Sequence, residues 1–354
     1  MKLWVYVVRR LILLFPTIIG LTFLVFALEH LGGTSLFLAQ YIDPHLTGAA
    51  RQQLVEELTA KFHLNDPVYV QYFYWLAAIF QGDWGISSTI RQPVATGFLW
   101  FLPNTIMLTL VASLLTWVIS IPIGVYSAAR RDSTLDQGVR IVTFTLYSMP
   151  VFLIGFALFL TLGTSWRILP DQGNVDPILL PTIPRTWFDD TNSVSYPTHI
   201  LALDALLHGE WTIASNSFLH VILPAVSLTL ALLAGIVRIL RASMLEVLEQ
   251  DYVRLARAKG VPERLVYGFH AKKNALLPTV TSYGYLVSGL FGGAVVIEDI
   301  FTFKGIGWWT TFSFLKGDVG VIMGATLVFG LILVGTTLIL DILYAFLDPR
   351  IRYE

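Results

Sequence analysis

The chain has 354 residues, of which 55% are hydrophobic and only 13% are charged, and its mean hydropathy is +0.68. A soluble domain usually carries about twice that charged fraction, so the composition excludes an ordinary soluble protein and indicates a membrane protein with several spans. The net charge of −1 provides no overall attraction for nucleic acid, and the absence of cysteine excludes disulfides, thiolate nucleophiles and cysteine-bound metals.

Six apolar stretches are long enough to cross about 30 Å of hydrocarbon. The first covers 11–28. A cleavable signal peptide is the alternative there, but a retained span fits better because the apolar core is long and no small-residue cleavage site follows it. The continuous apolarity of the stretches predicts helices rather than the alternating strands of a lipid-facing barrel. The other five stretches cover 104–128, 141–163, 218–240, 279–297 and 319–346.

The lysines and arginines predict the orientation of these spans. If the six spans alternate, 16 of the 23 basic residues fall on the side that holds both ends of the chain. Because cytoplasmic loops are enriched in lysine and arginine, both termini are predicted to be cytoplasmic. The two long outer connections, by contrast, carry more acids than bases.

The chain divides into four predicted parts. Residues 1–30 form an N-terminal tail and the first span, and residues 31–102 form an outer connection with amphipathic and interfacial helices. Within that connection, apolar residues of 48–62 fall on one helical face, and an aromatic stretch of the kind found at membrane surfaces follows. A five-helix core spans 103–346, including an outer lobe at 164–216 and a cytoplasmic loop at 241–277. Residues 347–354 form a cytoplasmic tail.

The segment "DYVRLARAKGVPERLVYGFHAKKNALLPTV" (251–280) concentrates positive charge. Residues 250–259 suit a helix that Gly260 ends, and Pro262 suits the first position of a second short helix. Any cytoplasmic loop is expected to be basic, so part of the charge needs no further explanation. The small residues Ala256, Ala258 and Gly260 would allow close approach of a partner, whose carboxylates the arginines would pair with.

Several stretches resemble the membrane subunits of ABC importers, specifically the dipeptide, oligopeptide and nickel class. The loop approximates that family's E-A-A-x-x-x-G signature, with Arg254, Leu255 and Ala256 at the first three positions and Gly260 at the glycine. It departs from the signature further on, at His270 and at Lys272–Lys273. The resemblance also rests on "VVRRLILLFPTIIGLTFLVF", "HLNDPVYVQYFYWLAAIFQGDWG", "LPNTIMLTL", "IPIGVYSAARRDSTLD", "HVILPAVSLTL", "GGAVVIEDIFTFKGIG" and "LDILYAFLDPRIR".

The resemblance implies an all-α permease with the type I importer fold and six transmembrane helices. It also implies a second homologous permease subunit in a heterodimer, two cytoplasmic ABC ATPases and an external substrate-binding protein. ATP and magnesium would bind only to the partner ATPases, since this chain contains no phosphate-binding G-x-x-x-x-G-K-[ST] loop. The coupling helix that docks on an ATPase would include Asp251, Tyr252, Arg254, Ala256, Arg257, Ala258, Lys259 and Gly260.

The cargo implied by the resemblance is short peptides, with oligosaccharides or nickel as alternatives. Two other classes of membrane protein are alternatives. A stand-alone secondary carrier would show inverted repeats and more spans, and an intramembrane enzyme would need a catalytic pair in the spans; the sequence shows neither pattern. The chain is therefore predicted to be a transport subunit of the cell membrane with no enzymatic activity and no bound cofactor or metal.

Other residues have less specific predicted roles. The small-residue pairs Gly289/Gly293 and Gly320/Gly324 would serve helix packing within the subunit or at a permease dimer interface. Glu298, Asp299 and Asp341 lie near span ends and would make an interfacial cap or a salt bridge, with a proton relay as the alternative. The polar span residues Asn104, Tyr147 and Ser148 are candidates for the translocation path.

Overall fold

The structure is a computed structural model that describes residues 3–31, 38, 42, 46–184 and 198–347. Within these ranges the chain is helical, and the β structure is limited to an isolated bridge between Ile86 and Pro93. Residues 348–354 of the predicted tail and 185–197 of the predicted outer lobe lie outside the described residues.

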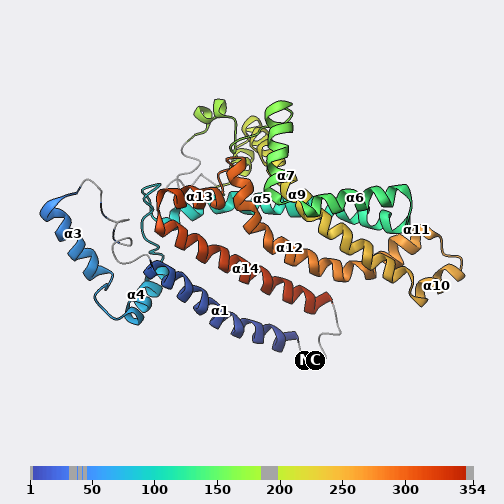
Figure 1. Cartoon of the computed structure of the whole chain (residues 1–354), viewed down its shortest axis with the longest axis horizontal. Coiled ribbons are helices and arrows are strands. Elements are labelled where there is room, and N and C mark those ends of the chain that lie inside the picture. The colour runs from blue at the N-terminus through green and yellow to red at the C-terminus, as the bar shows by residue number, and fades with distance from the viewer. Residues whose placement is uncertain (1–2, 32–37, 39–41, 43–45, 185–197, 348–354) are drawn as a thin grey trace.

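The helices follow the chain as Figure 1 shows. Their bounds are α1 (Leu3–Leu31), α3 (Gly48–Lys61), α4 (Val68–Phe80), α5 (Val94–Ala129), α6 (Thr134–Ser148), α7 (Val151–Leu158), α8 (Leu201–Leu207), α9 (Trp211–Leu248), α10 (Asp251–Ala258), α11 (Glu263–Leu265), α12 (Lys272–Ile300), α13 (Ile306–Lys316) and α14 (Val319–Leu347). Short π-helical stretches cover Phe159–Ser165 and Val266–Ala271, and a 3-10 helix covers Pro177–Thr182.

Four helices of the described chain are long and apolar enough to cross a membrane. They are Val94–Ala129, Trp211–Leu248, the continuous stretch Glu263–Ile300 and Val319–Leu340. The pair formed by Thr134–Ser148 and Val151–Ser165 makes a fifth if it is one broken span. The apolar part of α1, Leu11–Ala27, covers only about 25 Å at 1.5 Å per residue. The chain is thus an all-helical membrane protein with four to five candidate spans.

The stretch predicted as one span at 141–163 is not one helix. α6 ends at Ser148, α7 begins at Val151, and the two axes are bent by 104°. Met149, between them, has an extended conformation (φ −88°, ψ 130°), which is the conformation that a following proline imposes. Pro16, Pro122 and Pro224 lie inside helices that continue past them. Of the four prolines predicted to bend a span, only Pro150 separates two helices.

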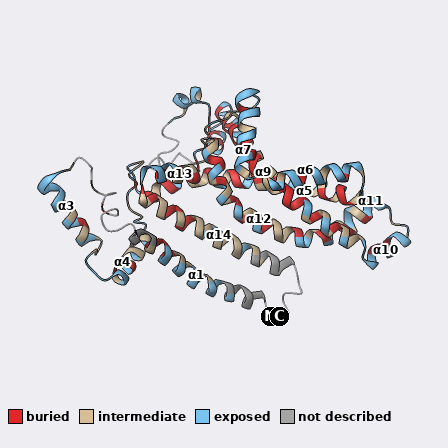
Figure 2. Cartoon of the chain, viewed as in Figure 1, coloured by how far each residue is buried: buried red, intermediate tan, exposed pale blue. Residues whose placement is uncertain are grey.

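The largest core lies where α5, α9 and α12 meet, as the buried residues of Figure 2 indicate. Leu108 of α5, Leu223 and Leu228 of α9 and Ile297 of α12 are fully buried there. Large apolar side chains on the outer faces of α1, α5 and α6 remain exposed. Such contiguous apolar surface is typical of contact with lipid or another subunit.

Helix α13 was not predicted from the sequence. Its Trp309 is fully buried and packs on Phe98 and Phe101 of α5, with ring centroids 5.4 Å and 5.0 Å apart. A side chain at Gly97 would overlap the Trp309 ring, so the small residue makes this packing possible. α13 thereby fixes the start of α14 against α5.

The two ends of the bundle differ. The start of α1 and the end of α14 point toward the end that carries α10, whereas α3, α4 and α13 lie toward the other end (Figure 1). Which side of the membrane this end of the bundle faces stays a prediction.

Candidate functional site

The basic loop contains helix α10. One face of this helix is buried against the rest of the subunit. Val253 is fully buried and Ala256 nearly so, while the residues between and beyond them are exposed. The hydroxyl of Tyr252 accepts a hydrogen bond of 2.7 Å from Asn274 of α12. Helix α10 is therefore anchored by its buried face and by a hydrogen bond to α12.

A glycine turn ends α10, as the sequence predicts. Gly260 has φ +76°, its N–H donates to the carbonyl of Arg257 at 2.9 Å, and the N–H of Val261 donates to the carbonyl of Ala256 at 3.1 Å. These two bonds form a Schellman motif, which caps the last carbonyl groups of a helix. No atom lies within 4 Å of where a side-chain carbon of Gly260 would stand, so the glycine is required by its backbone conformation and not by crowding.

The second helix of the loop differs from the prediction. Pro262 immediately precedes α11 instead of opening it, and α11 is not a short separate helix. It continues through the π-helical turn Val266–Ala271 into α12, so that Glu263–Ile300 forms one continuous helical stretch. The corner at Gly260 thus joins α10 directly to a membrane-spanning helix.

An ion pair spans this corner. Arg257 donates to the two carboxylate oxygens of Glu263 at 2.8 Å and 3.3 Å, and this contact raises the pKa of the guanidinium. Both side chains are more than one third exposed. Exposed pairs contribute only about 0–1 kcal/mol, so the pair orients the corner without dominating its stability.

Replacing Arg257 with glutamine is therefore expected to lower the free energy of unfolding by no more than about 1 kcal/mol. Denaturant or thermal unfolding of the purified protein in detergent measures this change. A larger loss would show that the ion pair is a main support of the corner.

The outer face of α10 is available to a partner. Tyr252 is 42% exposed and Leu255 is 55% exposed, and Arg254, Ala258 and Lys259 surround them. An exposed leucine and tyrosine among basic groups fit a partner surface that combines an apolar pocket with carboxylates. The structure brings together all eight residues that the sequence assigned to coupling, although Ala256 faces inward as an anchor.

Behind the loop lies an ion pair that the sequence analysis missed. Arg241 of α9 donates from Nε and from an Nη to the two carboxylate oxygens of Asp136 in α6, each at 2.7 Å. Asp136 is fully buried and also accepts from the Ser127 hydroxyl and from the Asp132 N–H. Ser133 caps α6 by accepting from the Asp136 N–H. The S-x-x-D spacing of Ser133 and Asp136 is visible in the sequence and predicts the start of a helix, although it does not predict the pairing of Asp136 with Arg241.

The glycine pairs divide between two surroundings. At Gly324 a side-chain carbon would come 2.7 Å from the Phe98 ring, so this glycine permits packing within the subunit. Gly293 has only an ordinary contact with Leu228, and Gly320 is half-buried. Gly289 is exposed, with nothing within 4 Å of the added carbon. A dimer contact at Gly289 stays a prediction.

The three path candidates do not share one site. The Asn104 amide is buried and donates to the carbonyl of Lys304 at 3.1 Å and to that of Trp100 at 3.3 Å. Tyr147 is exposed beside a groove between α6 and α9, and the Ser148 hydroxyl donates to the carbonyl of Phe144. Their role in a path stays a prediction.

Glu298 acts as a cap for α13 from a buried position and forms no salt bridge with the described residues. Its side chain is fully buried, and it has no cationic partner among the described residues. The carboxyl accepts from the Thr105 hydroxyl at 2.6 Å and from the Trp308 N–H at 3.0 Å. Glu298 therefore joins α12, α5 and the start of α13 through hydrogen bonds.

Residues 120–353 match the protein family described as "Binding-protein-dependent transport system inner membrane component". The chain belongs to this family. The matched region includes α10, its glycine corner and the Asp136–Arg241 pair.

Full-length relatives of the inner membrane component agree with this assignment. The oligopeptide transport system permease protein AppB of Bacillus subtilis is 37% identical over 98% of this chain and 99% of the relative. The dipeptide transport system permease protein DppB of Escherichia coli K12 is 34% identical over 99% of both chains. The di/tripeptide transport system permease protein DppB of Pseudomonas aeruginosa is 35% identical over 99% of both chains.

These relatives are transport permease subunits and not enzymes. The chain is accordingly a multi-pass permease subunit of the cell membrane, and ATP hydrolysis belongs to separate ATPase subunits. As an inner membrane component of a binding-protein-dependent system, it works with ATPase and substrate-binding partners.

Proposed function

We propose that this permease subunit imports short peptides. The relatives that match it over nearly the whole chain are named for oligopeptide, dipeptide and di/tripeptide transport. Oligosaccharides and nickel are the alternative cargoes for the same subunit. An uptake assay distinguishes these cargoes. The complete assembly in vesicles, with its binding protein, is offered a tripeptide, an oligosaccharide or Ni²⁺. Transport of only the sugar or only the metal would refute the peptide proposal.

The proposed topology has six spans with both termini in the cytoplasm. α1, the bent pair α6–α7 and the four long helices supply the six spans, and the excess of lysine and arginine supports the orientation. In this arrangement α10 lies on the cytoplasmic side, and the connections that carry α3, α4 and α8 face outward. Labelling of single cysteines introduced at Lys259 and at Glu210 tests it, since the chain has no cysteine of its own.

The proposed coupling site is the outer face of α10. Two ATPases would close on ATP, and each would push on one permease of a heterodimer. A force on α10 passes to α12 because the Gly260 corner, the Arg257–Glu263 pair and the Tyr252–Asn274 hydrogen bond join the two helices. This direct attachment of a small exposed helix to a spanning helix is the observation that carries the proposal.

Replacing Leu255 with glutamate is expected to abolish copurification with the ATPase and to reduce ATP-driven peptide uptake at least about tenfold. The exposed leucine supports little of the fold, but a buried charge at the centre of an interface costs several kcal/mol. Pull-down of the ATPases and peptide uptake into proteoliposomes measure the two effects.

The matched control is Leu207→Glu on α8, where the leucine is also well exposed but lies at the other end of the bundle. This control is expected to retain ATPase association. Gly260→Asp, which strains the left-handed corner, and Arg257→Glu, which replaces the ion pair with Glu263 by two like charges, are expected to act like Leu255→Glu. Unchanged association in all three variants would remove α10 from the coupling site.

A further inference from the structure

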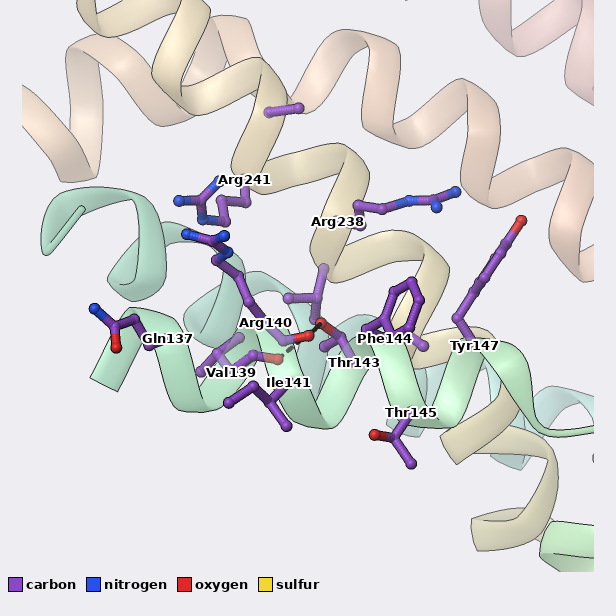
Figure 3. Close-up of a pocket in the computed structure, with 13 residues that line it drawn as sticks. Gln137, Val139, Arg140, Ile141, Thr143, Phe144, Thr145, Tyr147, Arg238 and Arg241 are labelled. Atoms are coloured by element: carbon purple, nitrogen blue, oxygen red, sulfur yellow. Dashed lines mark hydrogen bonds between the residues drawn. The ribbon is translucent and has the colours of Figure 1, made fainter. Parts of the chain in front are cut away.

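A groove of about 700 Å³ runs between α6 and α9 (Figure 3). Its charged lining consists of three arginines, Arg140, Arg238 and Arg241, and includes no carboxylate. The floor and walls also include Thr143, Phe144 and Tyr147. The groove is thus positive and partly aromatic, and apart from the path candidate Tyr147 and the Asp136 partner Arg241 its residues have no role in the argument above.

Two of the three arginines are available to a ligand. The charge of Arg241 is compensated by Asp136 at 2.7 Å. Arg238 has no ion-pair partner among the described residues and lies over the Tyr147 ring, 4.3 Å from its centroid. Arg140 lies 3.9 Å from Asp132, at the limit of an ion pair, and both side chains are more than half exposed. Figure 3 shows Arg140 reaching from α6 toward Arg241, and Tyr147 pointing toward Arg238.

The groove lies at the boundary of two apolar helices. Arg140 directly precedes the apolar part of α6, and Arg238 and Arg241 come at the end of the apolar part of α9. These helices are antiparallel neighbours, so both boundaries lie at the same end of the bundle as α10. Arginines at the ends of apolar helices lie at the depth of lipid headgroups.

An apolar surface continues from the arginines along α6. Ile141 is 68% exposed and Phe144 is 74% exposed, both on the part of the helix that enters the apolar region. A ligand that places an anion between Arg140 and Arg238 could therefore lay a hydrocarbon chain on Ile141 and Phe144. An anionic headgroup attached to an acyl chain has this combination of properties.

The lining also discriminates between ligands. A peptide carries an ammonium group as well as a carboxylate, and the groove offers no carboxylate to pair with the ammonium. A free inorganic anion would use the arginines but not the exposed apolar residues. We propose that the arginine groove between α6 and α9 is a binding site for an anionic phospholipid, with the positive charges of Arg140 and Arg238 attracting the headgroup and α6 contacting an acyl chain.

The test uses the full-length chain purified with its partner subunits in a neutral detergent. Phosphatidylglycerol or phosphatidylcholine with identical acyl chains is titrated in, and native mass spectrometry measures the bound lipid. The wild type is expected to bind phosphatidylglycerol at least about tenfold more tightly. The double variant Arg140→Gln/Arg238→Gln is expected to bind phosphatidylglycerol at least about tenfold more weakly than the wild type. Each arginine near a headgroup contributes a factor on the order of five to the affinity.

The matched control is Arg130→Gln. Arg130 also stacks on a tyrosine, 4.4 Å from the centroid of Tyr126, and it is exposed near the same end of the bundle but does not line the groove. It is expected to change lipid affinity by less than about twofold. The melting temperature of each variant reports folding, and the two single variants replace the double variant if that one does not fold.

Three results would overturn the proposal. The first is equal binding of the two lipids by the wild type, a measurement that needs no variant. The second is equal loss of affinity in Arg130→Gln and in the groove variants. The third is displacement of phosphatidylglycerol by inorganic phosphate or by a tripeptide at concentrations that leave micelles intact, which would assign the groove to a soluble anion or to cargo.

Discussion

Replacing Asp136 with alanine is expected to lower the free energy of unfolding by about 3–5 kcal/mol. The carboxylate is fully buried and holds Arg241 through two hydrogen bonds of 2.7 Å. Its loss leaves a largely buried guanidinium without a counter-charge. Removing one member of a buried ion pair destabilises a protein more than removing both members does. Denaturant unfolding of the purified protein in detergent measures the change.

The size of this effect follows from how many elements meet at Asp136. The carboxylate lies in the first turn of α6 and accepts from Ser127 near the end of α5, from the N–H of Asp132 in the connection, and from Arg241 of α9. Because α9 continues directly toward α10, a loosened contact here also weakens the support of the proposed coupling helix. We therefore expect reduced transport in Asp136→Ala even where some protein folds.

Two comparisons separate the buried pair from the general loss of an acid. Asp132→Asn removes a neighbouring charge whose side chain is 70% exposed and keeps a residue type that tolerates the left-handed backbone at this position (φ 63°), so it is expected to change stability by less than about 0.5 kcal/mol. Asp136→Leu combined with Arg241→Met removes both charges and is expected to recover part of the stability that Asp136→Ala loses. Equal stability of Asp136→Ala and the wild type would contradict the role of the pair.

The long helices and the glycine corner could be predicted from the sequence because their causes are local. Continuous apolarity locates the membrane-crossing parts of α5, α9, α12 and α14. The helices extend beyond the predicted apolar stretches because polar residues at the membrane interfaces also fit a helix. Gly260 ends α10 because a left-handed residue is needed there, and this requirement is visible in the residue type alone.

The features that the sequence did not predict depend on contacts between distant residues. The apolarity of 141–163 is continuous, and whether Pro150 bends a helix or breaks it depends on what packs on both sides. Helix α13 is specified by the fit of Trp309 between aromatic rings of α5, more than 200 residues earlier in the chain. Asp136 and Arg241 are 105 residues apart, so no local pattern joins them.

The C-terminal end of α12 carries a second buried carboxyl group, that of Glu298, which is expected to contribute as much to stability as Asp136. The two oxygens of Glu298 accept from the Thr105 hydroxyl and the Trp308 N–H, and the Thr105 hydroxyl in turn accepts from the Ile306 N–H at 2.8 Å. In the turn between α12 and α13, the carbonyl of Lys304 also accepts a hydrogen bond from the Asn104 amide. The Thr105 hydroxyl and the Glu298 carboxyl thus satisfy the N–H groups of Ile306 and Trp308 in the first turn of α13, which have no partner within that helix.

Replacing Glu298 with alanine is expected to lower the free energy of unfolding by about 3 kcal/mol or more. The change leaves the Thr105 hydroxyl and the Trp308 N–H buried without their acceptor, and each such loss costs about 1–3 kcal/mol. Denaturant unfolding in detergent measures the loss, and a smaller effect is expected for Glu298→Gln because the amide retains one acceptor oxygen.

Two further variants locate the cause. Asp299→Ala removes the next acid in the chain, which is exposed, and is expected to change stability by less than about 0.5 kcal/mol. Gly307→Ala keeps the carboxyl but places a carbon 2.5 Å from the Val295 Cα, so the turn must move away from Glu298. If the hydrogen bonds of Glu298 hold α13 in place, Gly307→Ala and Glu298→Ala together lose less stability than the two single losses combined. Additive losses would show that the carboxyl and the close approach of the turn support the fold independently.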